Sequence, residues 1–172
     1  MDKIKKILTI NGKSQYDEDI NEAFRPFACG PVTARIIMDQ FPPDDCPYDI
    51  NELFILLGTT KIGLFKSRFI RNMRKLLGSA WIVTECDIND VKKQILNGRP
   101  VAAKFDKWFN FRWRGGYEFD YHWVPVIGYE KKDGDIELII HDNGARNRPS
   151  QVRQVSYKKN KAVLSFVMIE PK

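Results

Sequence analysis

A cysteine ahead of a helix is the first candidate for chemistry. Cys29 lies in the segment Phe27-Ala28-Cys29-Gly30-Pro31, directly before an apolar helix that we expect to have Pro31 as its first residue. At such a position, free backbone N–H groups and the positive end of the helix dipole favour a thiolate, the nucleophilic form of cysteine. Gly30 leaves the backbone open, so a substrate carbonyl could reach the Cys29 amide as one donor of an oxyanion hole.

A histidine far downstream is the candidate for the base. His122 lies within the run of strand-forming residues from Tyr121 to Tyr129. A histidine held on a strand can take the proton of a thiol when a third group fixes its tautomer and orientation. Asp142 and Asn143 are candidates for that third group, because they follow the next predicted strand.

The turn between these two strands decides between Asp142 and Asn143. If Lys132-Asp133-Gly134 forms a three-residue loop with its glycine left-handed, Asp142 falls on the same face as His122. A two-residue turn would instead place Asn143 on that face. The composition of the segment suits the three-residue loop slightly better. We therefore expect Asp142 to be the third member and keep Asn143 as the alternative.

The first half of the chain carries the spacing and end signals of helices. An apolar stripe at every third or fourth position predicts one helix from Pro31 to Phe41, before Pro42-Pro43. Asp49 or Asn51 can cap a second helix from Glu52 to Leu57. A third helix from Phe65 to Leu77 ends at Gly78. Its basic residues fall on the remaining surface, where we expect a solvated face, so no nucleic-acid partner is expected.

The second half consists mainly of strands. The patterns predict four segments and a closing strand, with one short helix capped by Asp87 and running to Leu96; the strands are Ala80–Glu85, Pro100–Phe105, His122–Tyr129, Ile136–His141 and Ala162–Glu170. Pro125 inside a strand argues for an edge or a bulge. Helices followed by an antiparallel sheet predict an α+β fold. No linker or repeat divides residues 1–172, so we expect a single domain.

Composition narrows the class of protein. The chain has 172 residues and a net charge of +6, with the apolar and charged fractions of a folded protein. The apolar run Ile7–Ile10 is too short for a signal peptide or a membrane span, so we expect a cytoplasmic protein with no membrane partner. Cys29, Cys46 and Cys86 match no zinc spacing, and with only two histidines we expect no metal or other cofactor.

Taken in order, these motifs resemble the papain-like peptidases of family thirty-nine, the bacteriocin-processing cysteine peptidases that cut after a double glycine. The resemblance rests on Cys29-Gly30-Pro31, on Gly98-Arg99-Pro100-Val101, on His122-Trp123-Val124 with Gly128-Tyr129, and on Asp142 at the end of a strand. It covers most of the chain, from about Cys29 to Tyr157. It implies a papain-like fold in which helices pack on an antiparallel sheet.

The resemblance also implies a function. It predicts a hydrolase of peptide or isopeptide bonds with a peptide or protein substrate, in which Cys29 attacks, His122 moves the proton and Asp142 orients His122. Deamidation or acyl transfer would use the same groups. A silent module that binds peptides or a protein partner is the alternative. Oligomeric state stays open.

One family position departs from the pattern. Such enzymes carry an oxyanion-binding glutamine six residues before the cysteine, where this chain has Ala23. Asn21 is the nearest side-chain amide and is our expectation for the oxyanion donor, and the more distant Gln15 is the alternative; either one requires a rearranged loop before Phe24. The aromatic segment Trp108–Tyr121, which carries Gly115-Gly116 as a possible hairpin tip, would either line a peptide groove or cover the sheet.

Overall fold

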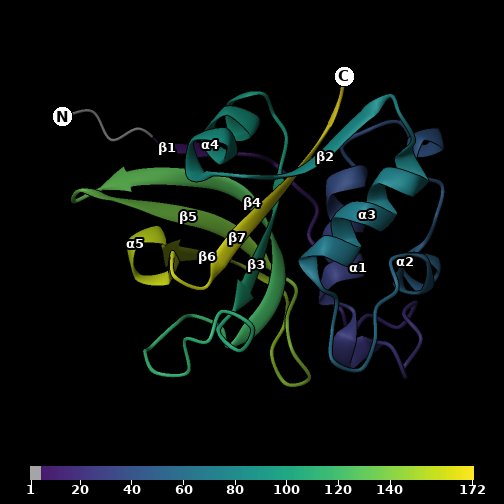
Figure 1. Cartoon of the computed structure of the whole chain (residues 1–172), viewed down its shortest axis with the longest axis horizontal. Helices are drawn as coiled ribbons and strands as arrows, with labels where there is room; N and C mark the ends of the chain where they lie inside the picture. Colours follow the sequence, from purple (N-terminus) through teal and green to yellow (C-terminus); the bar gives the residue numbers. More distant parts are fainter. Residues whose placement is uncertain (1–4) are drawn as a thin grey trace.

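The three α-helices of the first half of the chain lie together on one side of the molecule, on the right of Figure 1, whereas two later helices lie beside the strands. The computed structural model describes residues 5–172. The helices and 3-10 turns are η1 (Arg25–Phe27), α1 (Cys29–Met38), η2 (Pro43–Asp45), α2 (Ile50–Leu56), α3 (Lys66–Leu77), α4 (Ile88–Leu96) and α5 (Tyr157–Asn160). Two of these begin with a capping box, Asp49 with Glu52 on α2 and Asp87 with Asp90 on α4. The predicted helices are therefore confirmed.

The strands form one antiparallel sheet. They are β1 (Lys5–Ile7), β2 (Trp81–Cys86), β3 (Val101–Asp106), β4 (Tyr121–Lys132), β5 (Asp135–Asp142), β6 (Gln151–Ser156) and β7 (Leu164–Pro171). Their order is β2-β7-β3-β4-β5-β6, and β1 pairs with the far half of β4. The last strand thus lies inside the sheet, between β2 and β3. This mixture of helices and antiparallel sheet is the α+β class that the sequence predicts.

The two faces of the sheet carry different cores. Alternate residues of β3 point to opposite sides, and both sides are buried. Ala102 packs with Trp123 of β4 and with side chains of α1, α2 and α3. Ala103 packs on the other face with Val124 and with the α4 residue Val91. Helices therefore cover both faces of the sheet at β3, the strand that pairs with β4 beside His122.

Two local expectations are wrong. Helix α1 begins at Cys29 rather than at Pro31, so Cys29 lies in the first turn of the helix. The β4–β5 turn has two residues, Asp133 and Gly134, both with positive φ, and Lys132 pairs with Asp135. Such angles at both central positions define a type I′ turn, which suits the twist of a hairpin. Of the two alternatives expected at Pro125, the edge is excluded, because β4 lies between β3 and β5 in the sheet.

A bulge next to Pro125 shifts the register of the hairpin. Val126 pairs with Ile140, but Gly128 pairs with Ile139, so Ile127 is the extra residue. A Cβ on Gly128 would lie 2.4 Å from the Lys6 carbonyl oxygen of β1, which explains why this position has no side chain. The bulge that we expected near Pro125 is therefore confirmed.

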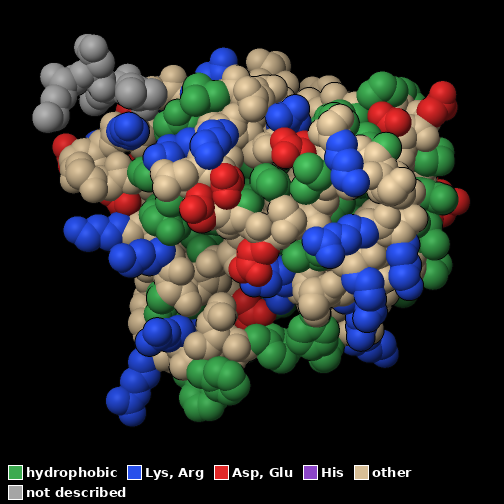
Figure 2. Space-filling model, turned by 45° about the horizontal axis from the view of Figure 1, so that its top comes forward, with side chains coloured by type: hydrophobic (Ala, Val, Ile, Leu, Met, Phe, Trp, Pro, Cys, Tyr) green, Lys and Arg blue, Asp and Glu red, His purple; other side chains and the backbone are tan. Residues whose placement is uncertain are grey.

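Basic side chains gather on one flank of the molecule, on the right of Figure 2, where α3 lies in Figure 1. Several of them bond within the fold: Arg68 donates to the Gly58 carbonyl at 2.8 Å, and Arg74 donates to the Val83 carbonyl at 2.7 Å. Arg74 thereby covers the outer edge of β2. Along residues 5–172, no helix combines the length and the apolar character that a membrane span requires.

Candidate active site

Cys29 occupies the first turn of α1, at the floor of a cleft between the helices and the sheet. Cys29 is 5% exposed and lines a cleft of about 560 Å³. Gly30 allows the helix to approach the loop before α3, because a Cβ there would lie 2.8 Å from the Leu64 side chain. The Cys29 carbonyl accepts a hydrogen bond from the Thr33 hydroxyl at 2.8 Å. The hydrogen bond thus fixes the backbone at Cys29, and the residue borders the open space of the cleft.

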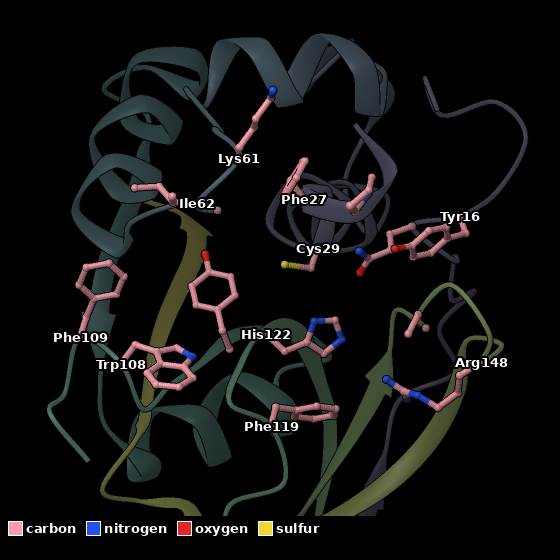
Figure 3. Close-up of a pocket in the computed structure, with 16 residues that line it drawn as sticks. Tyr16, Phe27, Cys29, Lys61, Ile62, Trp108, Phe109, Phe119, His122 and Arg148 are labelled. Atoms are coloured by element: carbon pink, nitrogen blue, oxygen red, sulfur yellow. The ribbon is translucent and has the colours of Figure 1, made fainter. Parts of the chain in front are cut away.

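His122 lines the same cleft from β4. In Figure 3, Cys29 lies directly above the His122 ring. The imidazole is held from two sides: Phe119 packs on it with ring centroids 4.8 Å apart, and its Nε2 lies 3.0 Å from Asp142 Oδ1. Because Nε2 is bonded to the carboxylate, Nδ1 is the nitrogen left to face the cleft.

Asp142 is fully buried and every contact to its carboxylate comes from a donor. Oδ1 accepts from the Gly144 backbone N–H at 3.0 Å in addition to His122. Oδ2 accepts from Arg153 Nη1 at 3.0 Å and forms an ion pair with Arg148. A buried carboxylate needs such partners to stay ionised. The structure therefore brings together Cys29, His122 and Asp142, the residues that the sequence selects.

Asn143 contacts helix α1 rather than His122. Its Nδ2 lies within 3.1 Å of three acceptors, which share its two N–H groups: the Cys29 carbonyl, the Thr33 hydroxyl and the Trp123 carbonyl. The side chain is completely buried. It joins α1 to β4 beneath the cleft, so the alternative of Asn143 as the partner of His122 does not match the geometry.

Asn21 does not reach the cleft, whereas Gln15 does. Asn21 Oδ1 accepts from the Ala23 backbone N–H at 3.0 Å in an exposed turn. Gln15 lines the cleft and is 5% exposed. Its backbone N–H donates to the Asn143 carbonyl at 2.9 Å, and its Nε2 donates to the Arg25 carbonyl at 2.8 Å. A carboxamide has two N–H donors, and the hydrogen bonds among the described residues account for one of them.

Tyr121 fixes the rim of the cleft opposite Cys29. Its hydroxyl accepts from the Leu64 backbone N–H at 2.8 Å and donates to the Leu64 carbonyl at 3.1 Å. Burial, with a further contribution from the nearby Cys29 sulfur, raises the pKa of the Tyr121 phenol. A Cβ on Gly63 would lie 2.2 Å from that hydroxyl, so only glycine fits there. The neutral phenol therefore fixes the loop at Gly63 and Leu64 through two hydrogen bonds.

The aromatic segment between β3 and β4 forms one end of the cleft. Trp108 and Phe109 line it and are 49% and 51% exposed. Phe111 is 76% exposed and does not line it. Behind this wall, the buried Lys104 ammonium pairs with Asp106 at 2.8 Å and lies 5.8 Å from the Phe109 ring centroid. The segment thus serves in part as a groove wall, as one of our two expectations had it.

Comparison with known proteins places this arrangement in a structural class. No family model matches the chain, and no curated protein sequence matches it. Solved structures do match, and the fold is that of C39-like peptidases, with papain-like architecture. The fold that the sequence predicts is therefore confirmed.

Two solved structures are similar over nearly their whole length. One is described as a C39-like peptidase from Bacillus anthracis; it is 14% identical with a TM-score of 0.67, over 98% of this chain and 100% of that chain. The other is a double glycine motif protease from an AMS/PCAT transporter in complex with the leader peptide; it is 10% identical with a TM-score of 0.55, over 98% of this chain and 99% of that chain. At these identities the likeness establishes the fold.

Proposed function

We propose that this chain is a cysteine peptidase that hydrolyses peptide or isopeptide bonds with Cys29, His122 and Asp142. One observation carries the proposal: Cys29 and His122 border a single cleft, and the other nitrogen of His122 bonds to the buried Asp142. A nucleophile, a base and a group that orients the base are the parts that such a reaction requires.

The first half of the reaction forms an acyl-enzyme. His122 Nδ1 takes the proton of Cys29, and the sulfur attacks the carbonyl carbon of the scissile bond. The carbonyl oxygen becomes an oxyanion, held by the Cys29 backbone N–H and by the free N–H of Gln15 Nε2. The C–N bond then breaks, and the leaving amine takes the proton from His122. Asp142 stabilises the imidazolium that exists between these two proton transfers.

The second half regenerates the thiol. Water gives a proton to His122 and attacks the thioester carbon, and the same donors hold the second oxyanion. The C–S bond breaks, the sulfur recovers its proton from His122, and the carboxylic acid product leaves. With an amine in place of water the outcome is acyl transfer, and with a glutamine side chain as substrate it is deamidation.

The cleft suits an extended peptide. Its volume of about 560 Å³ falls within the range of ligand sites, and aromatic and backbone groups line it on both sides of Cys29. The similar protease that was solved with a leader peptide supports a peptide substrate for this chain also. All three cysteines are free thiols, which suits a reducing compartment such as the cytoplasm.

The decisive experiment is brief labelling with iodoacetamide at neutral pH, followed by intact mass and peptide mapping. We expect Cys29 to be labelled fastest, and His122→Ala to slow that labelling. Cys29→Ala removes the fast site and is the matched control. Labelling of Cys29 no faster than that of Cys46 or Cys86, with no effect of His122→Ala, would exclude the enzyme.

Turnover is then tested with a randomised decapeptide library blocked at both ends, read by mass spectrometry. Cleavage that is lost in Cys29→Ala supports a peptidase. Fast labelling without cleavage of any library member would contradict the peptidase and favour the peptide-binding module. Release of ammonia from glutamine-containing peptides, without chain cleavage, would identify a deamidase.

A further inference from the structure

The charged side chains that line the cleft are positive. None of the described residues that line it is an aspartate or a glutamate, while Lys61 and Arg148 are both among them. Lys61 extends from the loop between α2 and α3, and Arg148 from the loop between β5 and β6; they lie on opposite sides of Cys29 in Figure 3. A cleft with one sign of charge and apolar walls attracts groups of the other sign.

The two arginines at Asp142 differ in a way that separates their roles. Arg153 lies on β6, outside the cleft lining, and is also paired with Glu118. Arg148 lines the cleft, its side chain is 34% exposed, and Asp142 is its one carboxylate partner among residues 5–172. Asp142 would keep Arg153, His122 and the Gly144 N–H if Arg148 turned outward.

Hydrogen bonds and close packing fix the backbone of the loop that carries Arg148. The backbones of Ala145 and Arg148 exchange hydrogen bonds at 2.9 and 3.2 Å. Gly144 has a φ of 80°, and a Cβ there would lie 2.8 Å from the Arg148 carbonyl oxygen. The guanidinium carbon lies 5.9 Å from the Phe119 ring centroid, which limits its freedom further. A preorganised guanidinium loses little entropy when it binds a planar anion.

We infer that Arg148 is a specificity residue that binds a carboxylate of the peptide substrate, an acidic side chain close to the scissile bond. The inference rests on the proposed function and names its substrate class. A guanidinium has five N–H donors, so one edge can stay with Asp142 while another binds a second carboxylate. At the opposite end lie Trp108, Phe109 and the 66% exposed Ile62. The substrate accordingly carries its acidic and its bulky apolar residue on opposite sides of the cleaved bond.

The test compares pairs of peptides that differ in one Glu or Gln. The randomised library first shows which positions are enriched in acid, and matched Glu and Gln peptides are then made for the strongest position. For the unmodified chain we expect kcat/KM to favour Glu by about tenfold, as befits one charge-assisted bond at a partly exposed site. The ratio should fall as salt is raised, because the site is not fully desolvated.

Three variants separate recognition from support of Asp142. Arg148→Gln should reduce the Glu/Gln ratio to about one, and Arg148→Lys should restore part of it. Arg153→Gln removes the other arginine from Asp142 and should leave the ratio at its original value. If both glutamine variants lower the rates of the two peptides equally and keep the ratio, Arg148 merely supports Asp142 and the inference fails.

Binding to the Cys29→Ala variant distinguishes this failure from failure of the proposed function. Fluorescence anisotropy with the same labelled Glu and Gln peptides needs no turnover. Preferential binding of the Glu peptide without any cleavage by the unmodified chain would retain the carboxylate site and overturn the peptidase. Cleavage with no preference for Glu at any position would retain the peptidase and overturn the carboxylate site.

Discussion

His122 Nε2 lies 3.0 Å from Asp142 Oδ1. This contact depends on a bulge at Ile127, which lies on β4 between His122 and the hairpin turn. The two-residue turn on its own would place Asn143 on the face of His122. One extra residue on β4 reverses that alternation and brings Asp142 onto the face instead. The identity of the acid partner therefore depends on a backbone irregularity several residues away.

The first prediction concerns the acid partner itself. Asp142→Asn should lower kcat roughly a hundredfold to ten-thousandfold, because an amide can present the wrong hydrogen-bonding atom to His122 and cannot stabilise an imidazolium. The measurement is peptide cleavage under saturating substrate. Circular dichroism of the same sample serves as the control for folding, since the variant also leaves Arg148 and Arg153 without their shared carboxylate. A folded variant with unchanged kcat would contradict the triad.

A second prediction separates the two side-chain amides near the oxyanion. Gln15→Ala should lower kcat by roughly a hundredfold with little change in KM, which is the usual loss for one oxyanion donor. Asn21→Ala is the matched control, because its side chain bonds only within the turn at Ala23 among the described residues. Equal effects of the two variants on kcat would refute the assignment of Gln15.

A third prediction concerns Cys46 and Cys86, the two thiols that we expect not to react with iodoacetamide. Burial, aided by the carboxylates of Asp90, Asp87 and Glu85, raises the pKa of Cys86 to about 12, and burial also raises the pKa of Cys46. Since only a thiolate reacts appreciably, neither should be alkylated at pH 7 while the chain is folded. Mass spectrometry should show one fast label on the native chain and three labels after unfolding in urea. Early labelling of Cys86 in the folded chain would count against this environment.

The fourth prediction is a loss of stability in mild acid. Burial lowers the pKa of His141 below its ordinary value of 6.5, because the enclosed imidazole is poorly solvated when charged. The unfolded chain then binds more protons than the folded one, so stability falls as the pH drops below about 6.5. Urea midpoints measured between about pH 7.5 and pH 5 should show this slope. His141→Gln should flatten it, and an unchanged slope in that variant would assign the effect to other groups.

Most of the helices and the pair Cys29 and His122 follow from local sequence. Asp49 and Asp87 cap helices as their spacing with later carboxylates indicates, and the glycine after α3 ends it with a φ of 78°. These features depend on neighbours within a few residues, and such interactions are visible in the sequence itself.

The features that sequence reasoning missed depend on contacts between distant segments. Strand β6 has one fully buried residue, Val155, and therefore little apolar alternation to reveal it. Gln15, which the sequence offers only as the more distant amide, enters the cleft because its backbone bonds to Asn143, a contact with no local signal. Gly128 did carry a signal for the register shift, since a glycine inside an apolar strand favours a bulge or close backbone approach. The three-residue turn that we expected is wrong. Asp142 nevertheless contacts His122, because the bulge at Ile127 shifts the register of the hairpin.

The amide of Asn143 has a mechanical consequence. By bonding to the carbonyls of both Cys29 and Trp123, it closes the seam between helix and sheet beneath the reacting atoms. Since this contact ties the two backbones together, we expect a bound peptide to be accommodated by the exposed loops around the cleft rather than by separation of α1 from β4. Together with the core packing of α1 against Trp123, the Asn143 side chain should therefore hold Cys29 and His122 at a fixed separation when substrate binds.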